Sequence, residues 1–163
     1  MSVLSDLNNV CPIDFSPFPW MEYAFEEIGT KEISGTRDNP RIKEYLASVH
    51  LGHAHDETPW CSAFANWCMK QADIRGTGKP NARSWLTWGQ ANACLATPCF
   101  GAVTILWRGQ RNGWQGHVGF YVGSWQGKIS LLGGNQGNKV SIAEFNPNRV
   151  LGYRWPASYQ LPI

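Results

Sequence analysis

A cysteine opens a predicted helix in the segment DETPWCSAFANWC, residues 56–68. Thr58 is a natural N-cap residue and Pro59 favours the first helical position, so Cys61 is expected in the first turn. Backbone N–H groups and the helix dipole stabilise an anion there, and the thiolate is the nucleophilic form of cysteine. Because free cysteines are also often buried in the core, this segment favours a reactive Cys61 and a structural one equally. Cys68, about two turns later, shares its face and is expected inside.

A histidine begins a predicted strand in the segment GHVGFYVG, residues 116–123. Alternation along the strand sends Val118 and Phe120 to the core and leaves His117 and Tyr121 on the opposite face. A helix that carries Cys61 could pack against this second face. A lone histidine is more often structural, but one on a strand downstream of a cysteine at a helix start is a candidate general base.

An amide side chain is the third candidate, in the segment LLGGNQG, residues 131–137. Asn135 could accept the other ring N–H of His117 through its amide oxygen, and the neighbouring Gln136 is the alternative. A glycine-flanked asparagine is equally typical of a plain turn. Together, Cys61, His117 and Asn135 would perform acyl transfer: the thiolate attacks an amide carbonyl, helix-start N–H groups hold the oxyanion, and His117 protonates the leaving amine.

A second group of polar residues offers different chemistry in the segment HLGHAHDE, residues 50–57. His53 and His55, with Asp56 and Glu57, could ligate zinc or copper and form a metal-dependent hydrolase. No HExxH helix accompanies them, so the cysteine centre is preferred. Asp56 or Glu57 could instead contact the Cys61 cleft.

The elements that must position these residues change in type along the chain. Helical spacing predicts helices over residues 19–29, 39–52 and 58–72, and a shorter one within 82–93. After residue 99, short β-branched and aromatic runs separated by Gly, Asn and Pro predict strands within 101–109, 116–123, 128–134, 139–145 and 150–156. The expected fold is therefore α+β, with N-terminal helices packed on a curled antiparallel sheet of five to six strands. We expect one cysteine-hydrolase domain over residues 18–163, preceded by an extension, 1–17.

Composition excludes several classes of protein. The chain has 163 residues, a formal net charge of +2 and nine tryptophans. It shows no basic stripe interleaved with aromatic residues, so nucleic acid is not an expected partner. No apolar run approaches the ~18 residues of a membrane span, and the N-terminus lacks a signal-peptide pattern, so we expect synthesis in the cytoplasm. Of five cysteines, Cys94 and Cys99 could close a small disulfide loop, although reduced thiols are favoured.

Five separated motifs carry a resemblance to a known family: PWCSAFANWC, ARSWLTWG, GHVGFYVG, LGGNQ and VLGYRWP. Together they resemble the papain-like fold in its reduced bacterial form, the CHAP and NlpC-type peptidoglycan hydrolases, and most of all a subgroup found in phages and in secreted-toxin loci. The likeness spans about residues 18–156. It implies Cys61 as nucleophile, His117 as base and Asn135 as the orienting residue. No acidic calcium-binding loop is present, so neither a metal nor another cofactor is expected.

The resemblance also implies a substrate and a place of action. The expected enzyme is a cysteine peptidase or amidase that cleaves peptide stems of peptidoglycan, as a phage lysin or a secreted antibacterial effector. It would act in the periplasm or cell wall after delivery by other machinery, and an effector would need a cognate immunity protein. Residues expected to bind substrate are Trp60, Trp85, Tyr121 and Gln136. The alternative from another class is a non-catalytic wall-binding module that uses exposed tryptophans.

Overall fold

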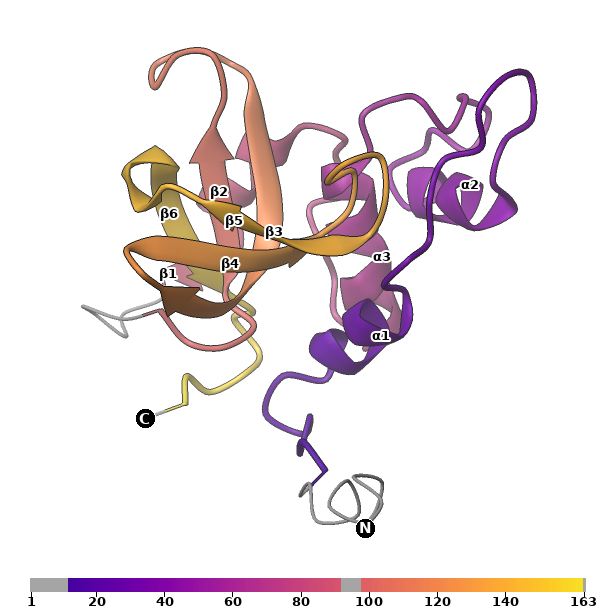
Figure 1. Cartoon of the computed structure of the whole chain (residues 1–163). Helices are drawn as coiled ribbons and strands as arrows, with labels where there is room; N and C mark the ends of the chain where they lie inside the picture. The colour runs from indigo at the N-terminus through magenta and orange to yellow at the C-terminus, as the bar shows by residue number, and fades with distance from the viewer. Residues whose placement is uncertain (1–11, 92–97, 163) are drawn as a thin grey trace, which may run out of the picture.

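Three α-helices precede an antiparallel sheet in the computed structural model, which describes residues 12–91 and 98–162 (Figure 1). The α-helices are α1 (Trp20–Glu26), α2 (Pro40–Ala47) and α3 (Cys61–Gln71). The predicted α+β class, with helices first and strands second, is confirmed. No helix within these ranges combines the length and the apolar character that a membrane span requires.

The helices are shorter than the spacing predicts because the chain turns soon after each one. The Asn39 side chain caps α2 by accepting a hydrogen bond from the backbone N–H of Arg41 at 2.9 Å, as its residue type predicts. The N–H of Leu51 bonds back to the carbonyl of Leu46 at 2.8 Å, and His50 takes a positive φ of 64°. This left-handed residue ends the helical run before residue 52.

The sheet has six strands in the order β1-β6-β2-β3-β4-β5 among the described residues. Their bounds are β1 (Gln90–Ala91), β2 (Val103–Trp107), β3 (Gly116–Trp125), β4 (Lys128–Gly133), β5 (Ser141–Phe145) and β6 (Val150–Trp155). Five of them are the predicted strands. All neighbouring pairs are antiparallel, and irregular register in the β2–β6 and β3–β4 pairs accompanies the curl of the sheet.

The first strand is one that the sequence did not predict. The segment expected to be a short α-helix forms a 3₁₀ helix, η2 (Ala82–Thr87), and then β1, which pairs with β6 through Gln90 opposite Trp155. Gly89 lies between them with a φ of +61°, and a Cβ there would collide with the Trp155 carbonyl oxygen. The turn that places β1 on the sheet edge therefore requires glycine.

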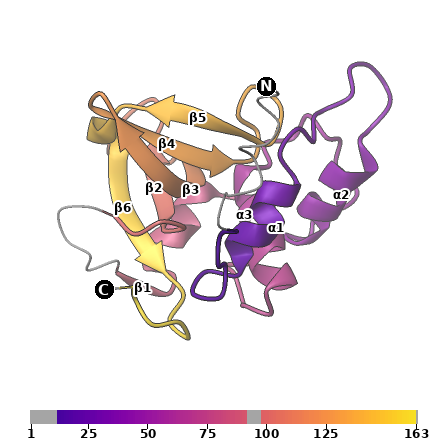
Figure 2. The same ribbon diagram turned by 60° about the horizontal axis from the view of Figure 1, so that its bottom comes forward.

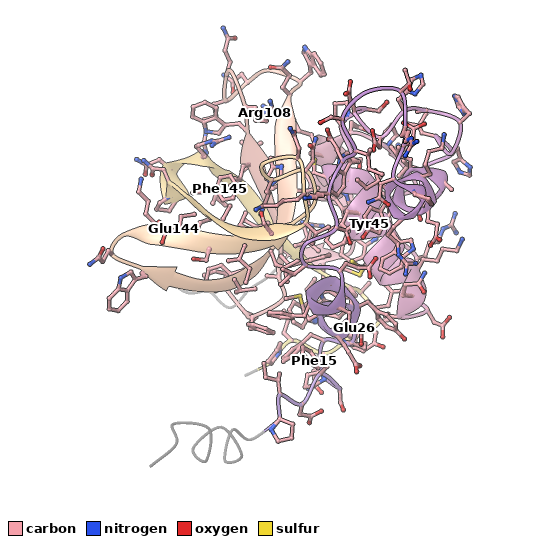
Figure 3. All side chains as sticks on the ribbon, turned by 45° about the vertical axis from the view of Figure 1, so that its right-hand side comes forward. Phe15, Glu26, Tyr45, Arg108, Glu144 and Phe145 are labelled. Atoms are coloured by element: carbon pink, nitrogen blue, oxygen red, sulfur yellow. The ribbon has the colours of Figure 1, made fainter. Side chains whose placement is uncertain are left out.

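The helices pack together on one side of the curled sheet, with α3 beside β3 (Figures 1 and 2). A chain of aromatic contacts crosses this interface: the ring centroids of Tyr45 and Phe64 lie 5.1 Å apart and those of Phe64 and Phe120 lie 6.4 Å apart. Tyr45 lies among the helices, whereas Arg108 and Phe145 lie on the sheet half of the molecule (Figure 3). The packing of α3 against the sheet holds the start of this helix in place beside the start of β3.

A glycine allows the closest approach between the helices and the end of β4. A Cβ on Gly134 would lie 2.6 Å from the Cβ of Phe64 and 2.7 Å from the Trp60 ring. Any larger residue would push the loop after β4 away from the start of α3. This loop carries Asn135 and Gln136, so Gly134 helps to keep both amides near the cysteine.

The predicted boundary at residue 17 is not marked by a break in packing. Phe15 already contacts the domain, because its ring centroid lies 6.0 Å from that of Phe25 and 6.3 Å from that of Phe18. The division into an extension and a domain remains a prediction.

Candidate active site

Helix α3 begins at Cys61 rather than two residues earlier. Thr58 does not cap the helix: its backbone N–H bonds to the His55 carbonyl at 3.0 Å, in a turn before the helix. Trp60 is the N-cap residue, and no side chain caps α3. The N–H groups of the first turn therefore remain available to an anion, and the N–H of Ser62 faces the Cys61 sulfur.

His117 is the second residue of β3, where it is nearly buried with 7% of its surface exposed. It lies opposite Leu106 of β2, and its ring stacks on Phe145 of β5 at a centroid distance of 5.4 Å. Its Nε2 atom lies 2.8 Å from Oε1 of Gln136. The histidine is thus held by its strand, by an aromatic ring and by an amide.

The neighbours of Gln136 fix which way its amide points. Its NH₂ group donates to the carbonyl oxygens of Leu131 at 3.1 Å and Ser141 at 2.7 Å. The amide oxygen must then face His117, and only a protonated Nε2 can donate to it. Three contacts therefore determine the tautomer of the histidine, and they leave Nδ1 as the ring nitrogen that is free to interact with Cys61.

The predicted orienting residue, Asn135, does not make this contact. It takes a left-handed conformation with a φ of +57°, and within the described residues the His117 ring bonds to Gln136 and not to the Asn135 side chain. The next residue, Gln136, occupies the position beside the ring instead. Gly133 makes room for it, because a Cβ there would lie 2.6 Å from Gln136 Oε1. The third member of the constellation is therefore the alternative amide, Gln136.

Cys61 and His117 lie close enough together that each changes the pKa of the other. Burial by itself raises the pKa of the Cys61 thiol, but the hydrogen bond and positive charge of His117 outweigh it, and with the N–H groups of Val118 and Ser62 they hold that pKa below its ordinary value. Burial lowers the pKa of His117, whereas the bonds to Cys61 and Gln136 raise it above its ordinary value. These opposite shifts favour a thiolate–imidazolium pair.

We expect iodoacetamide to alkylate Cys61 at about pH 6.5, where an ordinary thiol of pKa ~8.5 is largely protonated. The rate should fall only as the pH drops through the lowered pKa of Cys61, because protonation then removes the nucleophile. In His117→Ala, burial dominates and raises the pKa of Cys61, so the rate near neutral pH should fall by about tenfold or more. Mass-spectrometric mapping of the labelled cysteine over a pH series measures both profiles.

Cys68 is the internal control for this experiment. It lies on the same helix, is fully buried, and burial raises the pKa of its thiol well above the ordinary value. It should remain unlabelled in the native protein at every pH that labels Cys61. A Cys61 profile with its midpoint at the ordinary thiol pKa would contradict the ion pair.

We expect Gln136→Ala to lower the turnover of amide substrates by about 10- to 150-fold. The variant removes a hydrogen bond to a charged group, worth ~1.5–3 kcal/mol, which corresponds to that range in rate. Because the bond to Gln136 raises the pKa of His117, its loss should also shift the alkylation profile of Cys61 toward higher pH. A merely structural glutamine would leave this profile unmoved.

Asn135→Gly is the matched control, since glycine readily adopts the φ of +57° at this position. It should leave the pH profile of Cys61 in place. A shift in Asn135→Gly with none in Gln136→Ala would restore Asn135 as the orienting residue.

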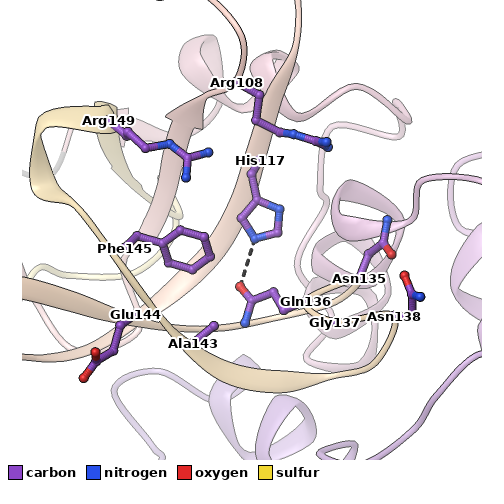
Figure 4. Close-up of a pocket in the computed structure, with 10 residues that line it drawn as sticks. All are labelled: Arg108, His117, Asn135, Gln136, Gly137, Asn138, Ala143, Glu144, Phe145 and Arg149. Carbon is purple, nitrogen blue, oxygen red and sulfur yellow. Dashed lines mark hydrogen bonds between the residues drawn. The ribbon is translucent and has the colours of Figure 1, made fainter.

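A pocket with a volume of about 590 Å³ opens on the side of His117 that faces Gln136 and Phe145 (Figure 4). Asn135 lines it, as do Arg108 and Arg149. Cys61 is not among its lining residues. The pocket therefore extends from the histidine, away from the thiol.

The predicted substrate-binding aromatic residues lie elsewhere. Trp60 is fully buried and donates to Oε1 of Glu32 at 2.9 Å, while Trp85 is fully buried and donates to the Ser62 hydroxyl at 2.9 Å. Tyr121, four residues after His117 on β3, is 5% exposed and packs on Tyr153 of β6. None of the three offers a ring to the pocket beside His117, so we assign none of them to substrate binding.

The segment before α3 has a structural role rather than that of a metal site. Asp56 is 1% exposed, and its Oδ2 accepts hydrogen bonds from the N–H groups of Ile33 at 3.0 Å and Asn39 at 2.9 Å. His55 is exposed and contacts Asp38 at 3.4 Å. In residues 12–91 and 98–162, no cluster of three or more His, Cys, Asp or Glu side chains is placed to hold a metal ion.

The predicted disulfide concerns a cysteine outside the described residues. Cys94 falls in the segment 92–97, which the structure does not describe. Cys99 is half-buried, with its Sγ 3.8 Å from the carbonyl oxygen of Pro162. The pairing of Cys94 and Cys99 therefore stays a prediction.

The arrangement of helices and sheet is shared with solved structures. The sequence matches no family model and no curated protein. An NlpC/P60 family protein from Bacillus cereus is similar over 94% of this chain, with 20% identity and a TM-score of 0.55. NlpC1 from Trichomonas vaginalis is similar over 88%, with 20% identity and a TM-score of 0.52.

The chain has the NlpC/P60 fold. This confirms the predicted NlpC-type papain-like architecture of helices packed on a curled antiparallel sheet. The chain covers 43% of the length of the Bacillus cereus structure and 45% of that of the Trichomonas vaginalis structure. This chain thus spans less than half the length of either of these larger structures.

Two basic residues of the site did not stand out in the sequence. Arg108 and Arg149 belong to separate segments, LWRG and NPNRVLG, which are ordinary strand ends when taken alone. The pairing of Leu106 with Val150 brings these ends together at one edge of β2 and β6. Predicting the pair would have required the order of the strands in the sheet.

Proposed function

We propose that this protein is a cysteine peptidase or amidase that cleaves amide bonds in the peptide stems of bacterial peptidoglycan. The observation that carries the proposal is the buried contact between Cys61, at the start of α3, and His117, whose second ring nitrogen is held 2.8 Å from Gln136. A structural cysteine needs neither a histidine partner nor a lowered pKa. The NlpC/P60 fold supports the same assignment.

The reaction follows from the positions of these groups. The Cys61 thiolate attacks the amide carbonyl carbon, and the resulting oxyanion is stabilised by backbone N–H groups at the start of α3. The His117 imidazolium gives its Nδ1 proton to the amide nitrogen as the C–N bond breaks, and the amine leaves. His117 then takes a proton from water, which attacks the thioester and releases the carboxylic acid. The thiolate is regenerated, and His117 is protonated again.

Gln136 acts through His117 rather than on the substrate. It holds the ring in one plane and one tautomer while the Nδ1 proton moves to the leaving amine and returns. The buried position of His117 limits exchange of this proton with bulk solvent. We therefore describe Cys61 and His117 as the catalytic pair and Gln136 as a positioning residue.

The place of action belongs to the same proposal. Peptidoglycan lies outside the inner membrane, so the protein would act in the periplasm or cell wall, either as a phage lysin or as an effector delivered into competing cells. The sequence motifs that resemble phage and toxin-locus proteins support these two roles. An effector would also require an immunity protein in the producing cell.

Digestion of purified peptidoglycan tests the reaction. Mass spectrometry of the soluble products should reveal new amino groups and new carboxyl groups in equal number, and the amine identifies the cleaved bond. The same digestion with the Cys61→Ala variant should yield no such products. Binding of the wild-type protein to peptidoglycan without any new amine would favour the alternative, a non-catalytic wall-binding module.

A further inference from the structure

The motif ARSWLTWG contains the 3₁₀ helix η2, and neither member of the catalytic pair belongs to it. Two of its residues, Arg83 and Trp85, project in different directions, because they are two positions apart in a helix of about three residues per turn. Arg83 donates hydrogen bonds to the loop between β2 and β3, whereas Trp85 donates one to α3. This short element therefore bonds to both halves of the molecule, and each half carries one member of the catalytic pair.

Arg83 holds the loop that joins β2 to β3 and leads into His117 (Figure 1). Among the described residues, Arg83 forms no ion pair with a carboxylate. All three of its side-chain hydrogen bonds go to backbone carbonyl oxygens of this loop: Gln110 at 2.9 Å, Arg111 at 2.9 Å and Gln115 at 2.8 Å. One guanidinium group thus fixes the path of the chain up to two residues before His117.

Arg83 also packs against the residue that immediately precedes His117. A Cβ on Gly116 would lie 3.2 Å from Cγ of Arg83 and 2.9 Å from the carbonyl oxygen of Leu106. Gly116 is therefore confined between the stem of Arg83 and β2. Since His117 is the next residue of the same strand, its position depends on this contact.

Trp85 holds the other member of the pair through Ser62. Trp85 is fully buried, and its Nε1 donates to the Ser62 hydroxyl oxygen at 2.9 Å. The same hydroxyl donates to the carbonyl oxygen of Lys79 at 2.7 Å, so both contacts fix its direction. Ser62 directly follows Cys61, and its N–H helps to hold the pKa of the Cys61 thiol below its ordinary value. Trp85 is therefore bonded to the first turn of α3, beside the nucleophile.

The apolar packing of α3 on β3 does not by itself set the distance between the catalytic residues. The contact across this interface joins Phe64 and Phe120, whose ring centroids lie 6.4 Å apart. Apolar contacts are non-directional, whereas hydrogen bonds are short and directional. The hydrogen bonds of η2 to both sides supply the geometric restraint that the apolar interface lacks.

We propose that η2 sets the position of Cys61 relative to His117, with Arg83 as a positioning residue for His117 and Trp85 as one for Cys61. Arg83 acts through the loop before β3, and Trp85 acts through Ser62. The effect on hydrolysis rests on the proposed function. The effect on the reactivity of the Cys61 thiol does not, because alkylation needs no substrate.

Arg83→Lys tests the proposal while it keeps the positive charge. A lysine ammonium is a single point and cannot reproduce three bonds in the fixed geometry of a guanidinium group. If His117 then moves away from Cys61, burial raises the pKa of the Cys61 thiol. The alkylation profile of Cys61 should therefore shift toward higher pH, in the direction of His117→Ala. Release of new amines from peptidoglycan should fall by about 10- to 100-fold.

The direction of the shift separates a displaced His117 from a displaced charge. Arg108 lies on the same loop, and its positive charge lowers the pKa of His117, whereas the bonds to Cys61 and Gln136 raise it. Displacement of Arg108 alone would favour the imidazolium and move the Cys61 profile toward lower pH. That outcome would overturn the role of Arg83 in positioning His117.

Arg154→Lys is the matched control, because Arg154 also donates to backbone carbonyl oxygens, those of Trp88 at 2.6 Å and Gly89 at 3.3 Å. These carbonyls lie after η2 rather than on the loop before His117. The control should lower the melting temperature and leave the Cys61 profile in place. An equal shift in Arg154→Lys would show general loosening of the fold and would overturn the proposal.

Trp85→Phe decides the matter by the same measure if Arg83→Lys fails to fold, since it keeps an aromatic ring and loses the N–H donor to Ser62. It too should shift the Cys61 profile toward higher pH. An unchanged profile in the folded variant overturns the positioning role and leaves the hydrolase function standing. If the wild-type protein releases no amines from peptidoglycan, the hydrolase proposal fails, and the alkylation profiles still decide the role of η2.

Discussion

Replacing Cys61 with alanine is expected to abolish amide hydrolysis by this protein while its fold persists. The variant removes the thiol that forms the thioester in the proposed reaction, and loss of a nucleophile from a catalytic unit lowers turnover by about 10⁶-fold. The change deletes one sulfur atom from Cys61, whose surface is 8% exposed. The free energy of unfolding should therefore fall by no more than about 1–2 kcal/mol. Chromatographic release of new amines from peptidoglycan measures activity, and a thermal melt measures the fold.

Cys68→Ala provides a matched control, because the same atom is deleted from the same helix. Cys68 is fully buried, seven positions after Cys61, and burial raises the pKa of its thiol well above the ordinary value. This variant should hydrolyse peptidoglycan at nearly the wild-type rate, although it leaves a cavity in the core. If Cys61→Ala retains activity, or if Cys68→Ala loses it in a folded protein, the assignment of the nucleophile is wrong.

His117→Ala extends the same test to the pair. Residues that act as one unit lose nearly all activity singly, so the double variant Cys61→Ala/His117→Ala should be no less active than either single variant. Additive losses would instead indicate that the two residues act independently. Such a result would show that His117 does not act through Cys61 in the reaction, although the two residues lie close together.

Local sequence patterns were sufficient for most of the fold. Alternating apolar residues and glycine-rich turns located the five longer strands, and Asn39 located the start of α2. The strand β1 was missed because two residues, Gln90 and Ala91, are too few to show any alternation. Their place is decided by pairing with β6, which lies more than sixty residues away along the chain.

The candidate site shows where local patterns stop being informative. Residue preferences placed Cys61 in the first turn of a helix, although the predicted cap, Thr58, was wrong. They could not decide between Asn135 and Gln136. Both are amides after a strand, and their roles separate only through the backbone turn at Asn135 and the carbonyl oxygens of Leu131 and Ser141 that hold Gln136. These are tertiary contacts that no spacing rule contains.

Trp60 is the clearest example of a neighbour with a different role. It directly precedes Cys61, and its large ring was expected to line a cleft. In the structure the ring turns inward to stack on Tyr45 and to bond with Glu32, a residue far earlier in the chain. Adjacency to the nucleophile therefore says nothing about exposure, because consecutive residues at a helix start point in different directions.

We expect the protein to be harmless in the cytosol of a Gram-negative host and lytic when it is fused to an export signal. The proposed substrate is absent from the cytosol and abundant in the periplasm, so the catalytic pair should have nothing to cleave until the chain crosses the inner membrane. Matched cytosolic and exported proteins, each with and without Cys61→Ala, can be compared by following culture density after induction. The expected pattern is lysis only on export and only with Cys61 intact.

The other patterns would each change the proposal in a definite way. Toxicity in the cytosol that requires Cys61 would point to an intracellular amide or ester and would overturn the peptidoglycan assignment. Lysis on export that persists in Cys61→Ala would show that harm does not need the thiol, and would favour a wall-binding module. If the folded protein is harmless both in the cytosol and after export, the peptidoglycan of this host is not its substrate. Hydrolysis should then be measured on purified peptidoglycan of another composition, and its absence there would overturn the peptidoglycan assignment.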